Sequence, residues 1–537
     1  MFPNRNHDSM DDRMAQPRSV LLGSLFIVMF VISYTTANNV LVNPMIGKGS
    51  HFYLSAAIGE QLIHRGYNVT FLLGSAFENH ARSSRYGHMF NWEVFKHPIP
   101  TQAVHDMFAN LSKLVSASDF KLQLSIHSVL QEARLNDCRA LLEDEALIGR
   151  LRAANFSVVL FDSTWVCGAM VGELLDLPYF VIFPYPNTCL VTSSQGSVFH
   201  PGYIPSMMTS YSNKMNFKER VINSLVYTLI TILGPYFYAP YNELTLRFGI
   251  PDPLELLTNS KLWLVNSDFV GEFPCALAPN VIPVGGLTTR AAEKLPANIE
   301  DFIQGSGDDG IIICSFGSFL ILDDSNLHVI RIFAEAFDRL PQRVIWLLKT
   351  PPPFPIPANI KILPWLPQND ILGHPQTRAL FFHGGHNSYY EAIYHGVPVV
   401  VMPIYGDQYD VAPRIVHHGL GLKLDKGFLT EENLYDALHD VTTNATYSNT
   451  AKRMSSTFQD RPMRPAERAA FWIDHAIKHG TDNLEIPVHT LSIFQYYLID
   501  VVSFISVVVI FFVYIVVKCC MLVRSRVCKF SKKPKTE

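Results

Sequence analysis

The sequence carries little charge. Only 17% of its 537 residues are Asp, Glu, Lys or Arg, and the formal net charge is −4. Proteins that bind nucleic acid through its phosphates need a basic surface, and here the basic residues gather only at the extreme carboxyl end. The composition therefore predicts no nucleic-acid partner.

Cysteine is also scarce, with eight in the chain. Five of them lie before the membrane-proximal end of the chain: Cys138, Cys167, Cys189, Cys275 and Cys314. They are odd in number and irregular in spacing, so the sequence implies no disulfide framework. Metal-ligand spacing is missing as well. His383-x-x-His386 flanks a Gly-Gly turn without a third ligand nearby, and His417-His418 has no support either. We predict no metal and no other cofactor.

Long apolar runs occur near both ends of the chain. The first, residues 20–32, follows two arginines and precedes small residues. This pattern predicts a signal peptide over residues 1–37, with an uncleaved anchor as the alternative.

The second run, residues 498–517, contains a single charge, Asp500, and is long enough to cross a bilayer as one helix. A basic tail, residues 518–537, follows it. The excess of Lys and Arg places this tail in the cytosol and the bulk of the chain in the lumen. The sequence thus predicts a single-pass type I membrane protein that contacts membrane lipid through this helix.

Between these ends, strand and helix patterns alternate, which indicates an α/β protein with parallel sheets. No repeat of fixed period is visible, but two Rossmann-like halves are, residues 38–285 and 310–490. A linker over residues 286–309 is predicted from its Pro and Gly content. Residues 221–233 are apolar and leave three alternatives: a core helix, the wall of an apolar-ligand pocket, or a segment lying on the membrane.

The most informative stretch runs from Trp365 to Gln408. It predicts a strand over residues 379–383, a Gly-Gly turn, and a helix that begins at Asn387. Glycines at such a turn admit a ligand close to the backbone, and the helix amino end offers N–H groups to an anion. Local alternatives stay open: a capping box of Ser388 and Glu391, a helix cap at Asp407, and a core position for Trp365.

Together these residues resemble the signature of the UDP-glycosyltransferases, most closely the animal membrane-bound UDP-glucuronosyltransferases. The likeness is carried by Trp365-x-x-Gln368, His383-Gly384-Gly385-x-Asn387-Ser388-x-x-Glu391, His395-Gly396-Val397-Pro398 and Gly406-Asp407-Gln408. It implies the GT-B architecture, in which two Rossmann-like domains face each other across a cleft. It also implies a UDP-sugar as co-substrate.

The resemblance assigns donor-binding roles to residues whose chemistry suits them. Trp365 can stack on uracil, and Gln368 can bond its polar edges, while Glu391 can accept from ribose hydroxyls. A further set of residues matches the rest of the donor. The diphosphate is matched by Ser318, His383, Asn387 and Ser388, together with the backbone at the Gly385 turn, and the sugar hydroxyls by Asp407 and Gln408.

Two further residues match the family's catalytic pair. His51 is expected in the loop after the first strand, and Asp162 at the carboxyl end of another strand in the same domain. Parallel sheets place such ends along one edge, where the two side chains can meet. The resemblance implies that His51 is the general base, oriented by Asp162, in a single displacement with inversion. For a lone histidine, a helix-end or core role is the ordinary alternative.

Four residues depart from the family pattern. His386 replaces the usual Met or Trp, Phe382 stands where Ser or Thr is frequent, and Tyr389-Tyr390 replaces Thr-Gln. Phe382 removes a hydroxyl that could bind phosphate.

The resulting hypothesis is an endoplasmic-reticulum enzyme that moves a sugar from UDP to a hydroxyl of a small lipophilic acceptor. Glucuronic acid is the expected sugar, with glucose as the alternative. The alternative functions are a lipid glycosyltransferase and a catalytically silent partner subunit. The protein could form a homo- or hetero-oligomer. Lys533 and Lys535 resemble a dilysine retrieval signal, or only set topology, and Asn110 and Asn444 are the preferred glycosylation sequons.

Overall fold

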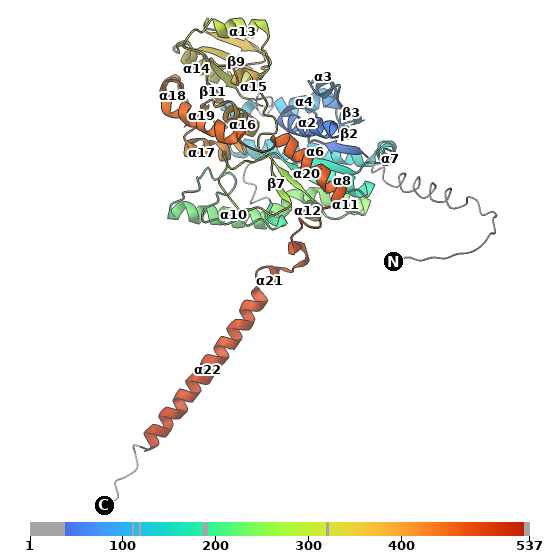
Figure 1. Cartoon of the computed structure of the whole chain (residues 1–537), viewed down its shortest axis with the longest axis vertical. Coiled ribbons are helices and arrows are strands. Elements are labelled where there is room, and N and C mark those ends of the chain that lie inside the picture. Colours follow the sequence, from blue (N-terminus) through green and yellow to red (C-terminus); the bar gives the residue numbers. More distant parts are fainter. Residues whose placement is uncertain are drawn as a thin grey trace, which may run out of the picture.

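The computed structural model of the chain describes residues 38–109, 112–116, 120–185, 192–317, 320 and 322–530. Two lobes, each built on a parallel sheet, form the body, and a long helix extends away from it (Figure 1). The predicted signal peptide, Ser318, Asn110 and the last seven residues, 531–537, lie outside the described residues.

The first sheet has the strand order β3-β2-β1-β4-β5-β6-β7, and its strands are parallel. Its strands are β1 (Asn39–Asn43), β2 (Asn68–Gly74), β3 (Asn91–Phe95), β4 (Val158–Asp162), β5 (Tyr179–Phe183), β6 (Trp263–Val265) and β7 (Val281–Pro283). Its helices include α2 (Gly49–His64), α3 (Glu78–Ser83), α4 (Thr101–Ala109), α5 (Lys113–Ser116), α6 (Phe120–Glu143), α7 (Glu145–Ala153), α8 (Cys167–Leu175), α10 (Phe217–Tyr238), α11 (Asn242–Phe248) and α12 (Pro253–Thr258).

The second sheet has the order β10-β9-β8-β11-β12-β13, again parallel. Its strands are β8 (Ile311–Ser315), β9 (Arg343–Leu347), β10 (Ile360–Leu363), β11 (Thr377–Phe382), β12 (Val399–Val401) and β13 (Gly421–Lys423). The helices from here to the end are α13 (Ala297–Gln304), α14 (Leu327–Asp338), α15 (Gln368–Leu372), α16 (His386–His395), α17 (Gln408–His418), α18 (Glu431–Thr443), α19 (Ala445–Gln459), α20 (Pro465–His479), α21 (Ile493–Tyr496) and α22 (Ile499–Phe530).

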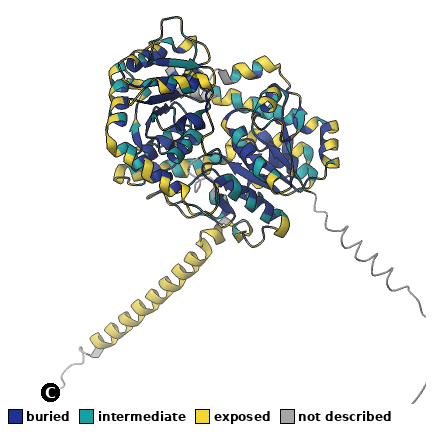
Figure 2. Ribbon diagram, turned by 45° about the horizontal axis from the view of Figure 1, so that its top comes forward, coloured by how far each residue is buried: buried dark blue, intermediate teal, exposed yellow. Residues whose placement is uncertain are grey.

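Both sheets are buried on their two faces, as parallel sheets require (Figure 2). Successive residues of β1 enter different hydrophobic clusters: Leu41 lies in one, and Val40 and Val42 lie in the other. In β8, Ile312 and Ile313 divide in the same way. The near-continuous apolar runs that predicted these strands follow from this double burial.

The strand order reverses at one place in each sheet, and these places position the site. In the first sheet the reversal lies between β1 and β4, and in the second between β8 and β11. In doubly wound sheets, ligands bind outside the carboxyl ends of the strands at such a switch point. The segments that follow these four strands are therefore where function is expected.

The segments between and after the sheets tie the lobes together. Residues 286–309 contain α13, whose Ile299 and Ile303 enter the core of the second domain. Near the end of the body, α20 returns to the first domain (Figure 1), where Ala469 and Ile473 join its core. Asp474 on α20 accepts hydrogen bonds from Tyr67 Oη at 2.7 Å and from Arg65 at 3.3 Å.

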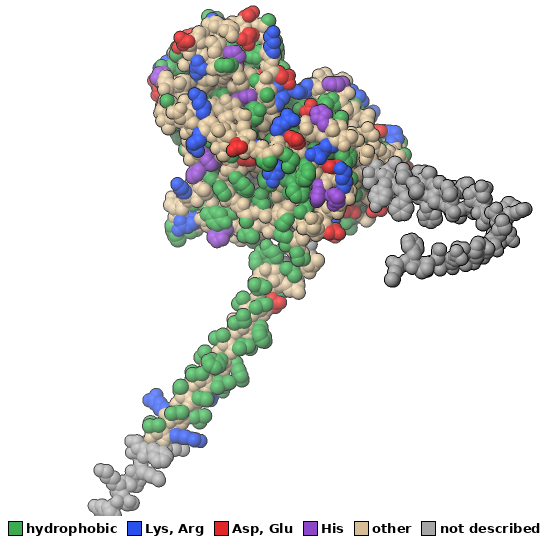
Figure 3. Space-filling model, in the orientation of Figure 1, with side chains coloured by type: hydrophobic (Ala, Val, Ile, Leu, Met, Phe, Trp, Pro, Cys, Tyr) green, Lys and Arg blue, Asp and Glu red, His purple; other side chains and the backbone are tan. Residues whose placement is uncertain are grey.

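Among the described residues, two helical stretches are long and apolar enough to cross a membrane: residues 217–248 and Ile499–Cys528. Figure 3 shows α22 covered by hydrophobic side chains, with Lys and Arg at its far end. Asn223 is the buried residue of α10, whose apolar side chains are largely exposed. The core-helix alternative for residues 221–233 is therefore wrong.

The first domain contains a disulfide that the sequence did not indicate. Cys138 of α6 and Cys167 of α8 are bonded, at a sequence separation of 29 residues. The pair joins two helices packed on the same sheet face, a proximity that only the tertiary fold creates. The expectation that no disulfide is implied is corrected for this pair.

Candidate active site between the two domains

The first switch point brings His51 and Asp162 together. His51 Nδ1 lies 2.6 Å from Asp162 Oδ2, and both side chains are largely buried. Asp162 ends β4, and His51 lies in the first turn of α2, which begins at Gly49, and not in the loop where the sequence pattern placed it. Because Nδ1 is bonded to the carboxylate, Nε2 is left to accept a proton.

Asp162 is held firmly as a carboxylate. Its second oxygen accepts hydrogen bonds from the Thr164 backbone N–H at 2.9 Å and from the Thr164 hydroxyl at 2.6 Å. Burial alone would raise the pKa of Asp162, but the neighbouring His51 and the Thr164 bonds lower it below its usual value. The dyad therefore pairs an ionised carboxylate with an imidazole, the arrangement that general-base chemistry needs.

An apolar cavity borders the segments that carry this dyad. Met45 and Ile46, between β1 and α2, and Trp165, just after β4, line it together with side chains from α4 and α6. Arg134 and Asp137 are the charged exceptions on α6, and the Arg134 guanidinium donates to the Thr164 carbonyl at 3.3 Å.

At the second switch point, the turn after β11 is built around His383. Gly384 has φ +93°, a conformation that strains other residues. A Cβ on Gly385 would lie 2.5 Å from His383 Nε2, and one on Gly317 would lie 2.9 Å from His383 Cε1. The imidazole thus fits only because glycine flanks it on both sides. Burial lowers the pKa of His383 to about 4, so the ring is neutral near pH 7.

Gln368 replaces the capping box that Ser388 and Glu391 could have formed. Its Nε2 donates to Ser388 Oγ at 2.8 Å and to Glu391 Oε2 at 2.7 Å, and α16 has no side-chain cap. The capping-box alternative is therefore wrong. Thr288 donates to the other Glu391 oxygen at 3.2 Å, a contact that no sequence pattern indicated. Burial raises the pKa of Glu391 to about 7.

Trp365 lies at the surface between the domains, with 57% of its area exposed. Its ring centroid is 6.4 Å from that of Tyr53 on α2. The core alternative for Trp365 is excluded, and a flat aromatic face remains free to stack on a base.

The segment before α17 holds Asp407 and Gln408. The Asp407 side chain does not cap α17, so that alternative is wrong, and burial raises its pKa. Gln408 is buried, and its Oε1 accepts from the backbone N–H groups of Ile404 at 2.9 Å and Tyr405 at 3.1 Å. Gln408 thus shapes the loop that carries Asp407.

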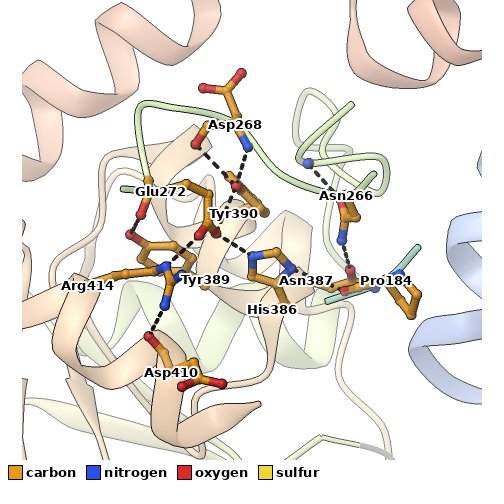
Figure 4. Close-up of polar contacts among 12 residues, drawn as sticks. Pro184, Asn266, Asp268, Glu272, His386, Asn387, Tyr389, Tyr390, Asp410 and Arg414 are labelled. Atoms are coloured by element: carbon orange, nitrogen blue, oxygen red, sulfur yellow. Dashed lines mark hydrogen bonds and ion pairs between the residues drawn. The ribbon is translucent and has the colours of Figure 1, made fainter. Parts of the chain in front are cut away.

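Asn387 connects the donor turn to the first domain (Figure 4). Its Oδ1 accepts from Asn266 Nδ2 at 3.0 Å, and its Nδ2 lies 3.5 Å from the carbonyl of Ser50, next to His51. Asn266 follows β6 and is fully buried. The two switch points therefore face each other, as the cleft hypothesis predicted. Within the described ranges, no group of three or more His, Cys, Asp and Glu could hold a metal ion.

Comparison with known proteins identifies the family. The family model described as UDP-glucoronosyl and UDP-glucosyl transferase matches residues 38–534. The chain belongs to this family. It is 33% identical to UDP-glucuronosyltransferase 1A9 of Mus musculus, over 93% of this chain and 94% of that protein. It is 32% identical to UDP-glucuronosyltransferase 2C1 of Oryctolagus cuniculus, over 91% of this chain and 99% of that protein.

Solved glycosyltransferase structures share the fold. The glycotransferase of kitacinnamycin matches with a TM-score of 0.55 and 19% identity, over 81% of this chain and 97% of that chain. The spinosyn forosaminyltransferase SpnP matches with a TM-score of 0.55 and 16% identity, over 82% and 99%. The predicted GT-B architecture is confirmed, and the family membership makes this UDP-glycosyltransferase an enzyme of sugar transfer.

Proposed function

We propose that this UDP-glycosyltransferase transfers glucuronic acid from its UDP carrier to a hydroxyl group of a small lipophilic acceptor. The observation that carries the proposal is the 2.6 Å contact between His51 and Asp162, opposite a glycine-lined turn at the amino end of α16. The acceptor binds in the apolar cavity beside His51. The UDP-glucuronosyltransferases among the relatives support glucuronic acid over glucose.

The reaction follows from this placement. His51 Nε2 takes the proton of the acceptor hydroxyl as the oxygen attacks the anomeric carbon. The bond from that carbon to the UDP oxygen breaks, and UDP leaves with the electron pair from the opposite face, so the configuration inverts. Asp162 stabilises the imidazolium that forms. The α16 amino end and neutral His383 stabilise the charge that develops on the diphosphate.

The donor roles follow from positions and chemistry. Trp365 stacks on uracil while Gln368 bonds its edge, and the diphosphate lies at the turn formed by Gly385 and its neighbours, where Ser318 also contributes. Glu391 accepts from ribose, and Asp407 accepts from the sugar hydroxyls. Gln408, whose oxygen is already bonded to backbone, contributes through its amide nitrogen and by holding the Asp407 loop.

For location, we propose a single-pass protein of the endoplasmic-reticulum membrane with its domains in the lumen. The exposed apolar α22 and the basic residues at its far end support the span and its direction. The Cys138–Cys167 disulfide supports an oxidising compartment for the first domain. Asn444, an exposed residue that caps α19, is the preferred glycosylation site in the described part of the chain.

The decisive experiment combines transfer and binding. Membranes containing the protein are incubated with labelled UDP-glucuronic acid or UDP-glucose and a panel of phenols, steroids and lipids. We expect transfer from UDP-glucuronic acid, its loss in His51→Ala, and unchanged UDP binding in that variant. Full activity of His51→Ala would refute the mechanism. Absence of transfer to any acceptor, with UDP binding intact, would favour the silent partner subunit.

A further inference from the structure

A buried carboxylate of the first domain reaches into the second. Glu272 lies between β6 and β7, and its two oxygens divide between two helices of the other domain (Figure 4). Oε1 is 2.8 Å from His386 Nε2 on α16, and Oε2 accepts from Arg414 Nε on α17 at 2.5 Å. All three side chains are at least 94% buried. Burial would raise the pKa of Glu272, but Arg414 and His386 lower it to about 2, so it is ionised.

His386 lies between two hydrogen-bond acceptors of the first domain. Nε2 faces the ionised Glu272, and Nδ1 lies 3.2 Å from the carbonyl oxygen of Pro184, which follows β5. A carboxylate and a carbonyl can only accept hydrogen bonds. Both contacts are therefore hydrogen bonds only when both ring nitrogens carry a proton. His386 is the first residue of α16, directly after the Gly384-Gly385 turn.

Asn387, the next residue of α16, also contacts the first domain, at other segments. Asn387 bonds to Asn266 after β6 and lies against the Ser50 carbonyl of α2. The first turn of α16 is thus seated on three segments of the first domain, those after β1, β5 and β6. Tyr389 adds a bond from its hydroxyl to the Gly271 carbonyl at 2.9 Å.

We propose that Glu272, His386 and Arg414 form an interdomain clamp, in which His386 is a positioning residue that holds the diphosphate-binding end of α16 in register with the catalytic loop. The clamp sets the affinity for the UDP part of the donor, and the inference rests on the donor site proposed above. Buried ion pairs are often no more stabilising than apolar residues of equal volume. A positioning role accounts for a buried ion pair and a buried histidine meeting at this one place better than a stabilising role does.

The test uses the full-length protein and two histidine variants on one helix. His386→Gln retains a donor for Glu272 but loses the contact with Pro184. His395→Gln is the matched control at the other end of α16, where the histidine bonds only to Asn369, at 3.1 Å. UDP affinity is measured by calorimetry, and the KM values and kcat are measured with UDP-glucuronic acid and a phenolic acceptor.

For His386→Gln we expect UDP affinity to fall about tenfold and donor KM to rise to match, with acceptor KM and kcat at saturating donor within about twofold. His395→Gln should match the unmodified protein. A loss of active enzyme alone would instead lower kcat with donor KM and UDP affinity unchanged, and that result would overturn the clamp. If the unmodified protein failed to bind UDP, the proposed donor site would fall and the clamp with it.

Glu272→Gln covers the possibility that His386→Gln does not fold, and a double variant tests whether the two residues act together. Glu272→Gln keeps the volume of the side chain and should weaken UDP binding in the same way. If His386 acts through Glu272, the double variant Glu272→Gln/His386→Gln should be no weaker than the weaker single variant. Effects that simply multiply would show that the two residues act independently and would overturn the proposal.

Discussion

In the proposed mechanism Asp162 acts on the substrate only through His51, and this makes its chemistry separable from donor binding. Asp162→Asn keeps the shape of the side chain and loses the charge that stabilises the imidazolium. We expect kcat to fall by about 10²- to 10⁴-fold, with donor KM little changed. Initial rates at saturating UDP-glucuronic acid measure the effect. A kcat within a factor of a few of the unmodified enzyme would contradict the dyad.

Glu391 is expected to make the free energy of unfolding depend on pH. In the described part of the chain no Lys or Arg forms an ion pair with Glu391 that would favour its ionised form. Its folded-state pKa, about 7, lies above the ordinary 4.5. The protonated form is thus favoured in the folded protein, and stability should fall as pH rises from about 4.5 to 7. The loss is at most about 3 kcal/mol, and less because the side chain keeps some contact with water.

The variant Glu391→Gln should lack this component. Thermal unfolding of the solubilised full-length protein at pH 5.5 and pH 8 compares the two chains, and other titrating groups cancel in the difference. We expect the unmodified protein to lose more stability than the variant between these pH values. Identical pH profiles would show that the buried carboxyl group is not the source.

At the scale of residues, the sequence predicted the side chains that lie on one continuous motif. Residues 365–408 supply most of the proposed donor site, because their spacing along one chain segment is fixed by the strand-turn-helix unit. Thr288, Asn266 and Glu272 were missed. Each reaches the site from the other domain or from the predicted linker, and each follows a strand end or turn with no local pattern of its own.

At the scale of elements, the turn between β11 and α16 depends on the absence of side chains. A Cβ at Gly385 would lie 2.5 Å from His383 Nε2 and would displace the ring. We expect Gly385→Ala to raise donor KM by about ten- to a hundredfold, because small displacements at a binding site are costly. The measurement is donor KM at fixed acceptor.

Gly149→Ala is the matched control. Gly149 lies within α7, and a Cβ there would meet no atom within 4 Å. Alanine in a helix interior should stabilise the protein by about 0.5 to 1 kcal/mol and leave donor KM unchanged. Equal donor KM values for Gly385→Ala and Gly149→Ala would refute the steric argument.

The elements that the sequence missed have weak local signals. β3 is only half-buried, and β7 has three residues and ends in proline, so neither shows a clear apolar run. No sequence signal marks the start of α2, because Lys48 offers no side-chain cap and Gly49 has φ +72°. This is why His51 was expected in a loop, although it lies in the first helical turn.

For the whole molecule, the sequence predicted one membrane-spanning helix and left a position on the membrane surface open for residues 221–233, which lie in α10. One face of α10 exposes apolar side chains over its whole length, among them Phe217, Leu225, Leu229, Ile232 and Tyr236. Its other side is held to the body by Asn223, which bonds to Ser206 and Ile204. Figure 1 shows α10 at the end of the body from which α22 leaves, and Tyr227 is within electrostatic reach of Tyr496 and Tyr497.

A helix with one exposed apolar face, next to a membrane entry point, suits the bilayer surface. Because α22 makes no buried contact with the body, a chain ending at residue 490 should keep its cores.

We expect this shortened chain to remain partly bound to phosphatidylcholine vesicles in a sedimentation assay. Leu225→Asp with Leu229→Asp should release it, since both side chains are more than half exposed and the change adds charge without removing core contacts. Phe428→Asp, at an equally exposed apolar residue of the second domain, is the control and should leave binding unchanged. Vesicle binding that is lost on truncation alone would restrict the membrane contact to α22.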